Sequence, residues 1–148
     1  MENQKKQEIK SLFVTYEIAI KLKEKGFDEP CFRGYNSAYT ENNKPVLHDF
    51  VYGELQTNTM YEKRRLADVN VCTAPLWQQV IDWLRINHNI DISITNCNNR
   101  NDEWEYRLYS MILSEKHNLD YDSSFNKLFF NTYEEAKQAA IEHALTLI

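Results

Sequence analysis

The stretch that decides the fold is residues 73–94, TAPLWQQVIDWLRINHNIDISI. Thr73 is suited to cap a helix, because its hydroxyl can accept a hydrogen bond from a free backbone N–H of the first turn. Pro75 falls within that turn, where the missing N–H of proline causes no loss. The apolar residues that follow recur at helical spacing and predict one buried face. That face consists of Leu76, Val80, Ile81 and Leu84.

The same stretch is predicted to pass from helix to strand at Asn89. Asparagine tolerates the left-handed conformation that ends many helices. After it the apolar residues alternate with polar ones, since Ile90, Ile92 and Ile94 are separated by single polar residues. Alternation of this kind is typical of a half-buried strand.

A second helix is predicted for residues 15–25, and its buried stripe consists of Ile18, Ala19 and Leu22. Gly26 suits the left-handed position that follows a helix. Phe27 can then fold back onto Leu22, as a Schellman ending requires. This local pattern predicts a helix, a tight stop and then an extended chain.

Residues 33–68 have many aromatic side chains but weak periodicity. Asparagine, lysine and proline at 42–45 predict a turn. The alternation at 46–52 indicates a strand that pairs with residues 31–35 as a hairpin. Residues 55–65 are expected to form a loop.

The C-terminal part of the chain predicts two further strands and a last helix. The strands are expected at 104–113 and 127–131. Thr132 and Glu135 have the spacing of a capping box, which predicts that a helix begins between them. Its alanine-rich sequence at 133–147 permits close packing against a sheet.

These elements place the chain in the α+β class. We expect an antiparallel sheet of three to five strands, covered on one face by helices 15–25, 74–88 and 133–147. The length suits a single domain, 1–148. Its N-terminal part, 1–72, holds one helix and an irregular aromatic-rich lobe, and residues 73–148 form an α-β-β-β-α unit.

The composition argues against several classes of function. A net charge of −5 disfavours general affinity for nucleic acid or anionic membranes. No apolar run is long enough to span a membrane, and the N-terminus lacks the apolar core of a secretion signal. The cysteines are odd in number and lack zinc-binding spacing, which predicts a reduced, cytoplasmic protein without a metal or cofactor. They are Cys31, Cys72 and Cys97.

The helix, the strands and the ending TYEEAKQAAIEHALTLI are together similar to a double-stranded-RNA-binding domain. This resemblance covers about half of the chain and implies a shared topology. Binding in that family needs lysines at the start of the last helix. Here Glu134 and Glu135 occupy those places, and only Lys137 matches the pattern. The polar segment 98–101, which is expected at the tip of a hairpin, also lacks the Gly-Pro-x-His loop of that family. RNA binding is therefore not expected.

A second resemblance covers more of the chain. Its segments are VTYEIAIKLKEKGFDEPCF, APLWQQVIDWLR, WEYRLY and TYEEAKQAAIEHAL. In this order they look like a family of small uncharacterised proteins encoded by phages and mobile elements of gut bacteria. The resemblance implies a context, the cytoplasm of a host cell, and brings no activity with it.

The residues offer little support for catalysis. Glycine loops for phosphate and the HExxH and GxSxG motifs are missing. His48 and Asp49 could form half of a metal or acid–base site, but the sequence does not supply a partner. His143 is expected to be a hydrogen-bonded residue of the last helix, and Cys31 to be buried. The chain is therefore predicted not to be an enzyme.

The candidate binding residues are tyrosines and arginines of the middle segment, since both types are favoured in binding surfaces. They are Arg33, Tyr35, Tyr39, Tyr52, Tyr61, Arg64 and Arg65. The leading hypothesis is a non-catalytic phage or mobile-element accessory protein that binds a host protein or itself. The alternatives are a binder or sponge of a small nucleotide-like ligand and a nucleic-acid binder of double-stranded-RNA-binding shape. It also remains open whether these tyrosines simply cover the sheet.

Overall fold

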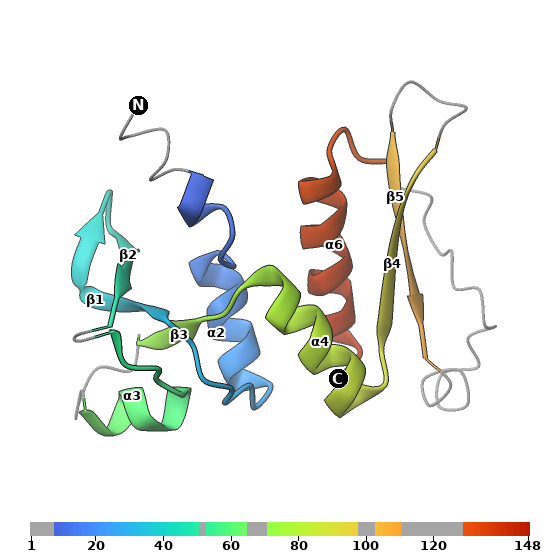
Figure 1. Ribbon diagram of the computed structural model, residues 1–148. Coiled ribbons are helices and arrows are strands. Elements are labelled where there is room, and N and C mark those ends of the chain that lie inside the picture. Colours follow the sequence, from blue (N-terminus) through green and yellow to red (C-terminus); the bar gives the residue numbers. More distant parts are fainter. Residues whose placement is uncertain (1–7, 51–52, 65–70, 98–102, 111–128) are drawn as a thin grey trace. The chain divides into compact units, whose positions relative to one another are not determined.

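The computed structural model describes residues 8–50, 53–64, 71–97, 103–110 and 129–148, without the side chains of 37–39 and Arg64. The chain divides into two compact units, Met1–Gln79 and Val80–Ile148, and the division falls inside one helix. The elements confirm the α+β class (Figure 1). They are α2 (Tyr16–Glu24), β1 (Arg33–Glu41), β2 (Lys44–Asp49), α3 (Asn58–Arg64), β3 (Cys72–Ala74), α4 (Trp77–His88), β4 (Asp91–Asn96), β5 (Trp104–Tyr109) and α6 (Tyr133–Thr146).

The helix α2 has the boundaries and the ending that its sequence predicts. The Thr15 hydroxyl accepts from the Ile18 N–H at the first turn. Gly26 has a φ of 87°, in the left-handed region. The Phe27 N–H then donates to the Leu22 carbonyl at 2.9 Å, and the Gly26 N–H donates to Lys23 at 3.0 Å. These two bonds define a Schellman ending, and the prediction is confirmed.

The N-terminal unit contains an antiparallel sheet with the strand order β2-β1-β3. The predicted hairpin is present, and Tyr35 lies opposite Leu47. Its turn consists of Asn42 and Asn43, which both have positive φ values, 52° and 61°. Two consecutive left-handed residues match the twist of a two-residue hairpin. β1 is consequently longer than the sequence pattern suggests, and β2 begins two residues earlier, at Lys44, so that both strands run up to this turn.

The prediction that Thr73 caps α4 and that Pro75 lies in its first turn is wrong. Thr73 lies in β3, opposite Gly34 of β1. The Pro75 carbonyl accepts from the Val14 N–H at 3.0 Å, which ties it to the segment before α2. Because this backbone is committed to tertiary pairing, α4 begins only at Trp77.

The prediction of a loop at 55–65 is also wrong, since α3 occupies most of it. Its start is stabilised from another part of the chain: the Thr59 N–H donates to Asp28 Oδ1 at 2.7 Å. Free N–H groups at a helix start are satisfied well by a carboxylate. The two residues lie 31 positions apart, so no local pattern could reveal this cap.

In the C-terminal unit, α4 ends at the predicted stop. Asn89 has a φ of 54°, and the Ile90 N–H donates back to the Leu84 carbonyl at 3.1 Å. The predicted buried face is confirmed in part. Val80 and Leu84 are buried, Leu76 and Ile81 are half-buried, and Trp83 joins the buried set.

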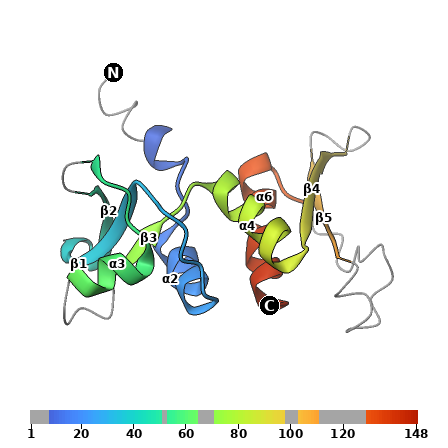
Figure 2. The ribbon, with the colours of Figure 1, turned by 60° about the horizontal axis from the view of Figure 1, so that its bottom comes forward.

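Strands β4 and β5 form an antiparallel pair, in which Ile94 lies opposite Tyr106. The helix α6 packs along this pair (Figure 2). The Tyr106 hydroxyl lies 3.2 Å from His143 Nδ1, so His143 is hydrogen-bonded as expected. On the same face Trp104 contacts Tyr133, with ring centroids 5.3 Å apart. The core side of α6 is lined by Ala136, Ala140, Ile141, Ala144 and Leu145.

The capping box of α6 is only partly as predicted. Thr132 Oγ1 accepts from the Glu135 N–H at 3.2 Å, as a cap should. The Glu135 carboxylate, however, accepts from the N–H of Asn131, one residue earlier than expected. Thr132 has an extended backbone, and Asn131 and Thr132 form a bend before the helix.

The predicted third strand of this unit reduces, among the described residues, to one bridge. Phe130 pairs with Trp104 through two backbone bonds of 2.8 and 2.9 Å. The described order is therefore α-β-β-α with an added bridge, instead of α-β-β-β-α. The predicted strand 104–113 ends earlier, since β5 stops at Tyr109 and Ser110 is not part of it. Residues 111–113 and the predicted loop at 114–126 lie outside the described residues.

The capping role of Asp28 predicts a pH-dependent loss of stability. Burial raises the pKa of Asp28, but hydrogen bonds from Thr59, Thr57 and Asn58 outweigh it and lower the pKa below 3.8. The stabilisation is therefore present above pH 3.8 and is lost as the pH falls further. Asp28→Ala should lower the free energy of unfolding by about 1 kcal/mol at neutral pH. Urea unfolding at neutral pH and at about pH 3 measures this difference, which should shrink in acid.

Glu29→Ala is the matched control, because Glu29 is adjacent and exposed. Its effect should stay within about 0.5 kcal/mol. Equal losses for both variants at neutral pH would contradict the capping role.

Candidate functional site

Tyr35, one of the predicted binding residues, is a buried side chain of β1. Only 8% of it is exposed, and its hydroxyl donates to the Val14 carbonyl at 2.7 Å. Its ring meets the ring of Tyr16 edge-on at 5.5 Å. Burial also raises the pKa of Tyr35 far above its ordinary value. The structure thus gives this tyrosine a packing role that joins β1 to the segment before α2.

Tyr61 on α3 belongs to an aromatic cluster beneath β2. Its hydroxyl lies 2.9 Å from His48 Nε2, and its ring lies 4.9 Å from that of Phe50. This side chain is 4% exposed. His48 is therefore hydrogen-bonded within the unit.

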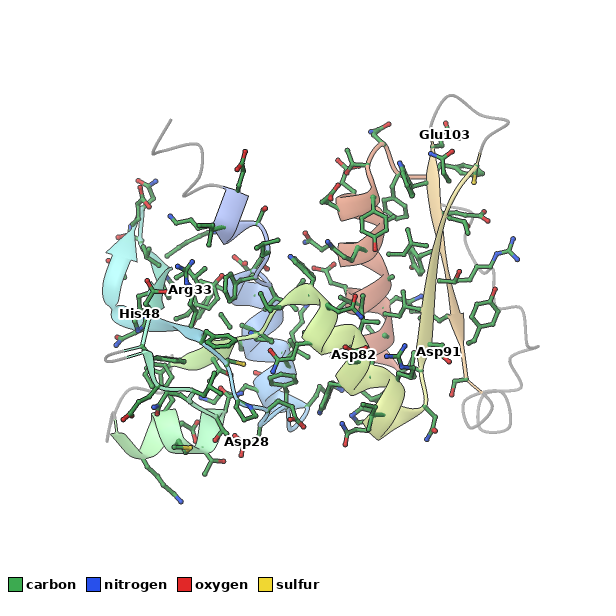
Figure 3. All side chains as sticks on the ribbon, in the orientation of Figure 1. Asp28, Arg33, His48, Asp82, Asp91 and Glu103 are labelled. Carbon is green, nitrogen blue, oxygen red and sulfur yellow. The ribbon has the colours of Figure 1, made fainter. Side chains whose placement is uncertain are left out.

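Arg33, at the start of β1, is paired across the sheet. Its Nε lies 2.5 Å from Asp49 Oδ1, and its guanidinium lies 5.0 Å from the centre of the Phe13 ring. Figure 3 shows the side chains of Arg33 and His48 on the β1–β2 hairpin. His48 and Asp49, considered above as half of a metal or acid–base site, have separate partners, since Asp49 pairs with Arg33 and the His48 ring lies within hydrogen-bond distance of the Tyr61 hydroxyl.

The side chains of the remaining predicted residues lie outside the part of the chain that the structure describes. Tyr39 lies in β1 and Arg64 in α3, but their side chains lie outside the described part of the structure. Tyr52 and Arg65 lie outside it entirely. Of the predicted set, Tyr35 and Tyr61 make separate hydrogen bonds, to the Val14 carbonyl and to His48.

Two cysteines are buried in the N-terminal unit. The Cys31 thiol lies 3.4 Å from the Glu29 carbonyl and 3.8 Å from Gln79 Oε1. Burial raises the pKa of Cys31 to about 11 and the pKa of Cys72 to about 12. A thiol reacts as its thiolate, so both are poorly suited to nucleophilic chemistry at neutral pH.

A shallow groove of about 300 Å³ lies beside the tip of the β1–β2 hairpin. The charged residues that line it are Lys10, Lys44 and Glu41. Lys44 also pairs with Glu17 at 3.1 Å, with both side chains more than half exposed. The rest of the lining consists of Tyr35, Asn42, Pro45, Val46 and Leu47. Its size is at the lower end of known ligand sites.

The feature that sequence reasoning missed is a pair of exposed apolar side chains, which we call the Phe32–Leu55 surface. Phe32 is 60% exposed and Leu55 is 45% exposed. Cys31 and Gln56, their neighbours in sequence, form an antiparallel bridge through two backbone bonds of 2.9 and 3.0 Å. Side chains alternate between faces along an extended chain. Cys31 and Gln56 are buried, whereas Phe32 and Leu55, each next to one partner of the bridge, are exposed.

The sequence carried only a weak signal for this surface. A phenylalanine after Pro30 and Cys31 is more easily interpreted as a core residue, because aromatic side chains dominate cores. The partner segment at 54–57 contains no alternation that would mark a strand. The pairing with Gln56 is tertiary, and only the structure shows that Phe32 faces outward.

Comparisons with known proteins add no relative from which a site could be transferred. A scan against protein-family models finds no match, and searches of curated proteins and of solved structures find no significant one. Among the described residues no group of three or more His, Cys, Asp or Glu side chains could hold a metal ion. None of the described helices is long and apolar enough to cross a membrane.

The thiol environments predict a clear order of reactivity. Cys97 is half-buried, whereas Cys31 and Cys72 are buried with raised pKa values of about 11 and 12. Titration of the native protein with a disulfide reagent at pH 7.5 should label one thiol quickly and two only after unfolding. Cys97→Ser should remove the fast phase. Fast labelling in that variant would contradict the burial of the other two thiols.

Proposed function

We propose that this chain is a non-catalytic binding protein, which contacts a protein partner through the Phe32–Leu55 surface. The observation that carries the proposal is the exposure of two large apolar side chains, Phe32 and Leu55, each next to one partner of the Cys31–Gln56 backbone bridge. Aromatic side chains that protrude from a rigid backbone are frequent anchors of protein interfaces. The resemblance to phage and mobile-element proteins makes a protein of the host cell the proposed partner.

The environments of the potential catalytic groups support a non-catalytic role. His48 and His143 each lie within hydrogen-bond distance of a tyrosine hydroxyl. Burial lowers the pKa of His143 and raises that of Cys31, so both groups are neutral at pH 7. We therefore assign none of these side chains a role in acid–base or nucleophilic chemistry.

A second candidate is the binding of a small anionic or nucleotide-like ligand in the groove beside the hairpin. It is favoured by the two lysines that line the groove, Lys10 and Lys44, beside the apolar Pro45, Val46 and Leu47. It is weakened by the carboxylates of Glu41 and Glu17 nearby. A thermal-shift screen with nucleotides tests it, and the lack of any shift would remove this candidate. Nucleic-acid binding ranks last, because Glu134 and Glu135 stand exposed in the first turn of α6.

The proposal predicts that Phe32→Ser weakens partner binding at least tenfold, since a central aromatic anchor contributes about 2 kcal/mol. Its melting temperature should stay close to that of the wild type, because the side chain is 60% exposed. Affinity capture from host lysate would first identify the partner. Calorimetry with the purified partner would then measure the loss.

Ile86→Ser is the matched control, because Ile86 is an apolar side chain of α4 that is 73% exposed. It should leave the affinity within about twofold of the wild type. The proposal fails if Phe32→Ser binds like the wild type, or if the wild-type protein captures no partner.

A further inference from the structure

We propose that the outer edge of β4 pairs with the same edge of a second copy of this chain, so that two C-terminal units form one continuous antiparallel sheet. This self-association goes beyond the proposed function, because it uses the other unit of the chain and a partner of identical sequence. The backbone of β4, its sequence and its apolar face each support the pairing.

The backbone groups on one side of β4 point away from β5. The Cys97 N–H donates to the Glu103 carbonyl at 2.7 Å, so these residues form a hydrogen-bonded pair at the end of the β4–β5 ladder. In an antiparallel ladder, hydrogen-bonded and non-hydrogen-bonded pairs alternate. The N–H and C=O groups of Ile92, Ile94 and Asn96 therefore point outward. No strand or bridge among the described residues lies along this side of β4.

The other edge of the sheet, on β5, already has a partner. Trp104 and Phe130 exchange two backbone bonds of 2.8 and 2.9 Å. The backbone groups of Trp104 thus point away from Asn96, which lies opposite it in β4, and this agrees with the alternation. Within the described part of the chain, β4 is the edge at which the sheet can still grow.

The sequence of β4 contains none of the features that keep an edge strand from pairing. Natural edge strands are protected by lysine, by proline or by bulges. β4 has the sequence DISITN, and its register with β5 runs from Asp91 to Asn96 without a shift. Its only charged residue is Asp91, at the first position (Figure 3). A regular, nearly uncharged edge of this kind is suited to accept another strand.

Charge and symmetry favour a second copy of the chain as that strand. A two-fold contact uses the same surface on both subunits, and an axis perpendicular to the sheet makes the two β4 strands antiparallel. If Ile94 lies opposite its own copy, Asp91 lies opposite Cys97; if Ser93 does, Asp91 lies opposite Thr95. Neither register places a carboxylate directly opposite another, so the like-charge repulsion that would oppose the contact is avoided.

The apolar face of the sheet continues to the outer edge of β4. The Tyr106 hydroxyl lies 3.2 Å from His143 on α6, so Tyr106 is on the face that α6 covers. Residues directly opposite each other in a ladder share a face, which places Ile94 and, by alternation, Ile92 on it too. Both isoleucines are only half-buried. Pairing about a perpendicular axis would join the isoleucines of both copies in one apolar strip, and a sheet of more strands is more stable than a two-stranded one.

Light scattering during size-exclusion chromatography of the full-length protein tests the pairing. A contact along one strand is small, so we expect a dissociation constant on the order of 10 µM. The mass should therefore be that of a dimer at about 200 µM protein and of a monomer at about 1 µM. Over the same range the amide NMR signals of Ile92, Ile94 and Asn96 should shift together.

A pair of charge variants tests whether β4 is the contact. Ser93→Lys and Ser93→Glu each bring like charges together across the two-fold axis, and each should raise the dissociation constant about tenfold or more at low salt. An equimolar mixture of the two variants should recover the dimer, because the charges are then opposite. Recovery also shows that both variants are folded. Thr146→Lys is the control, since it adds the same charge at an exposed position of α6, and its dissociation constant should stay within about twofold of the wild type.

The pairing is overturned by a monomer at every concentration, by a dimer that neither Ser93 variant weakens, or by a mixture that recovers no dimer. Concentration-dependent shifts at Phe32 and Leu55 instead of β4 would also overturn it, because the other unit would then be the contact. Failure of the proposed function is distinguishable, since Phe32→Ser should leave self-association unchanged and Ser93→Lys should leave the affinity for a host partner unchanged.

Discussion

The buried amide of Asn58 holds the N-terminal unit together. Its Nδ2 donates to the Phe27 carbonyl at 2.7 Å, and its Oδ1 accepts from the Thr73 N–H at 2.8 Å. One side chain thereby joins the end of α2, the start of α3 and the strand β3. Each buried backbone group that lost this partner would cost about 1–3 kcal/mol. A short α3 of seven residues could not be stable alone, so its place depends on this bond.

The outward direction of Phe32 follows from that anchoring. Gln56 lies two residues before Asn58. Its backbone N–H and its carbonyl both hydrogen-bond to the backbone of Cys31. Cys31 and Gln56 are buried, and the residues next to them, Phe32 and Leu55, are left exposed. The candidate interface thus lies beside a backbone bridge whose two residues are buried.

A second constraint lies at Gly34, one residue after Arg33. A Cβ at this position would lie 2.7 Å from the Phe50 ring and 2.9 Å from the Cys72 carbonyl. Both distances are shorter than normal contacts, so only glycine allows β1 to lie this close to Phe50 and β3. The sequence shows an isolated glycine here, and the reason for it is a tertiary contact that has no local pattern.

The sequence predicted those parts of the fold that local chemistry determines. The stops at Gly26 and Asn89, the cap at Thr132 and the asparagine turn of the hairpin each depend on neighbouring residues, and all are present. The predictions that are wrong concern segments whose structure is determined by hydrogen bonds between residues far apart in sequence. Thr73 has the chemistry of a cap but is held in β3, and α3 begins where Asp28, far away in sequence, satisfies its free N–H groups.

The candidate site was less predictable than the fold, for a related reason. Tyrosine and arginine are common in interfaces, but they are also effective packing residues with polar ends. Tyr35 and Tyr61 prove to be buried, with their hydroxyls close to Val14 and His48. Phe32 shows the converse, because a residue type that usually packs inside is exposed when its neighbour takes the inward position.

Amide hydrogen exchange in the wild type and in Asn58→Ala tests the central claim most directly. If Asn58 holds α3, β3 and the Cys31–Gln56 bridge in one cooperative unit, the amides of Thr73, Cys31 and Gln56 exchange slowly in the wild type. In Asn58→Ala all three should exchange faster together, by about tenfold or more. Free-peptide exchange rates at Cys31 and Gln56 in the wild type, or an acceleration confined to Thr73, would contradict a surface positioned by this bond.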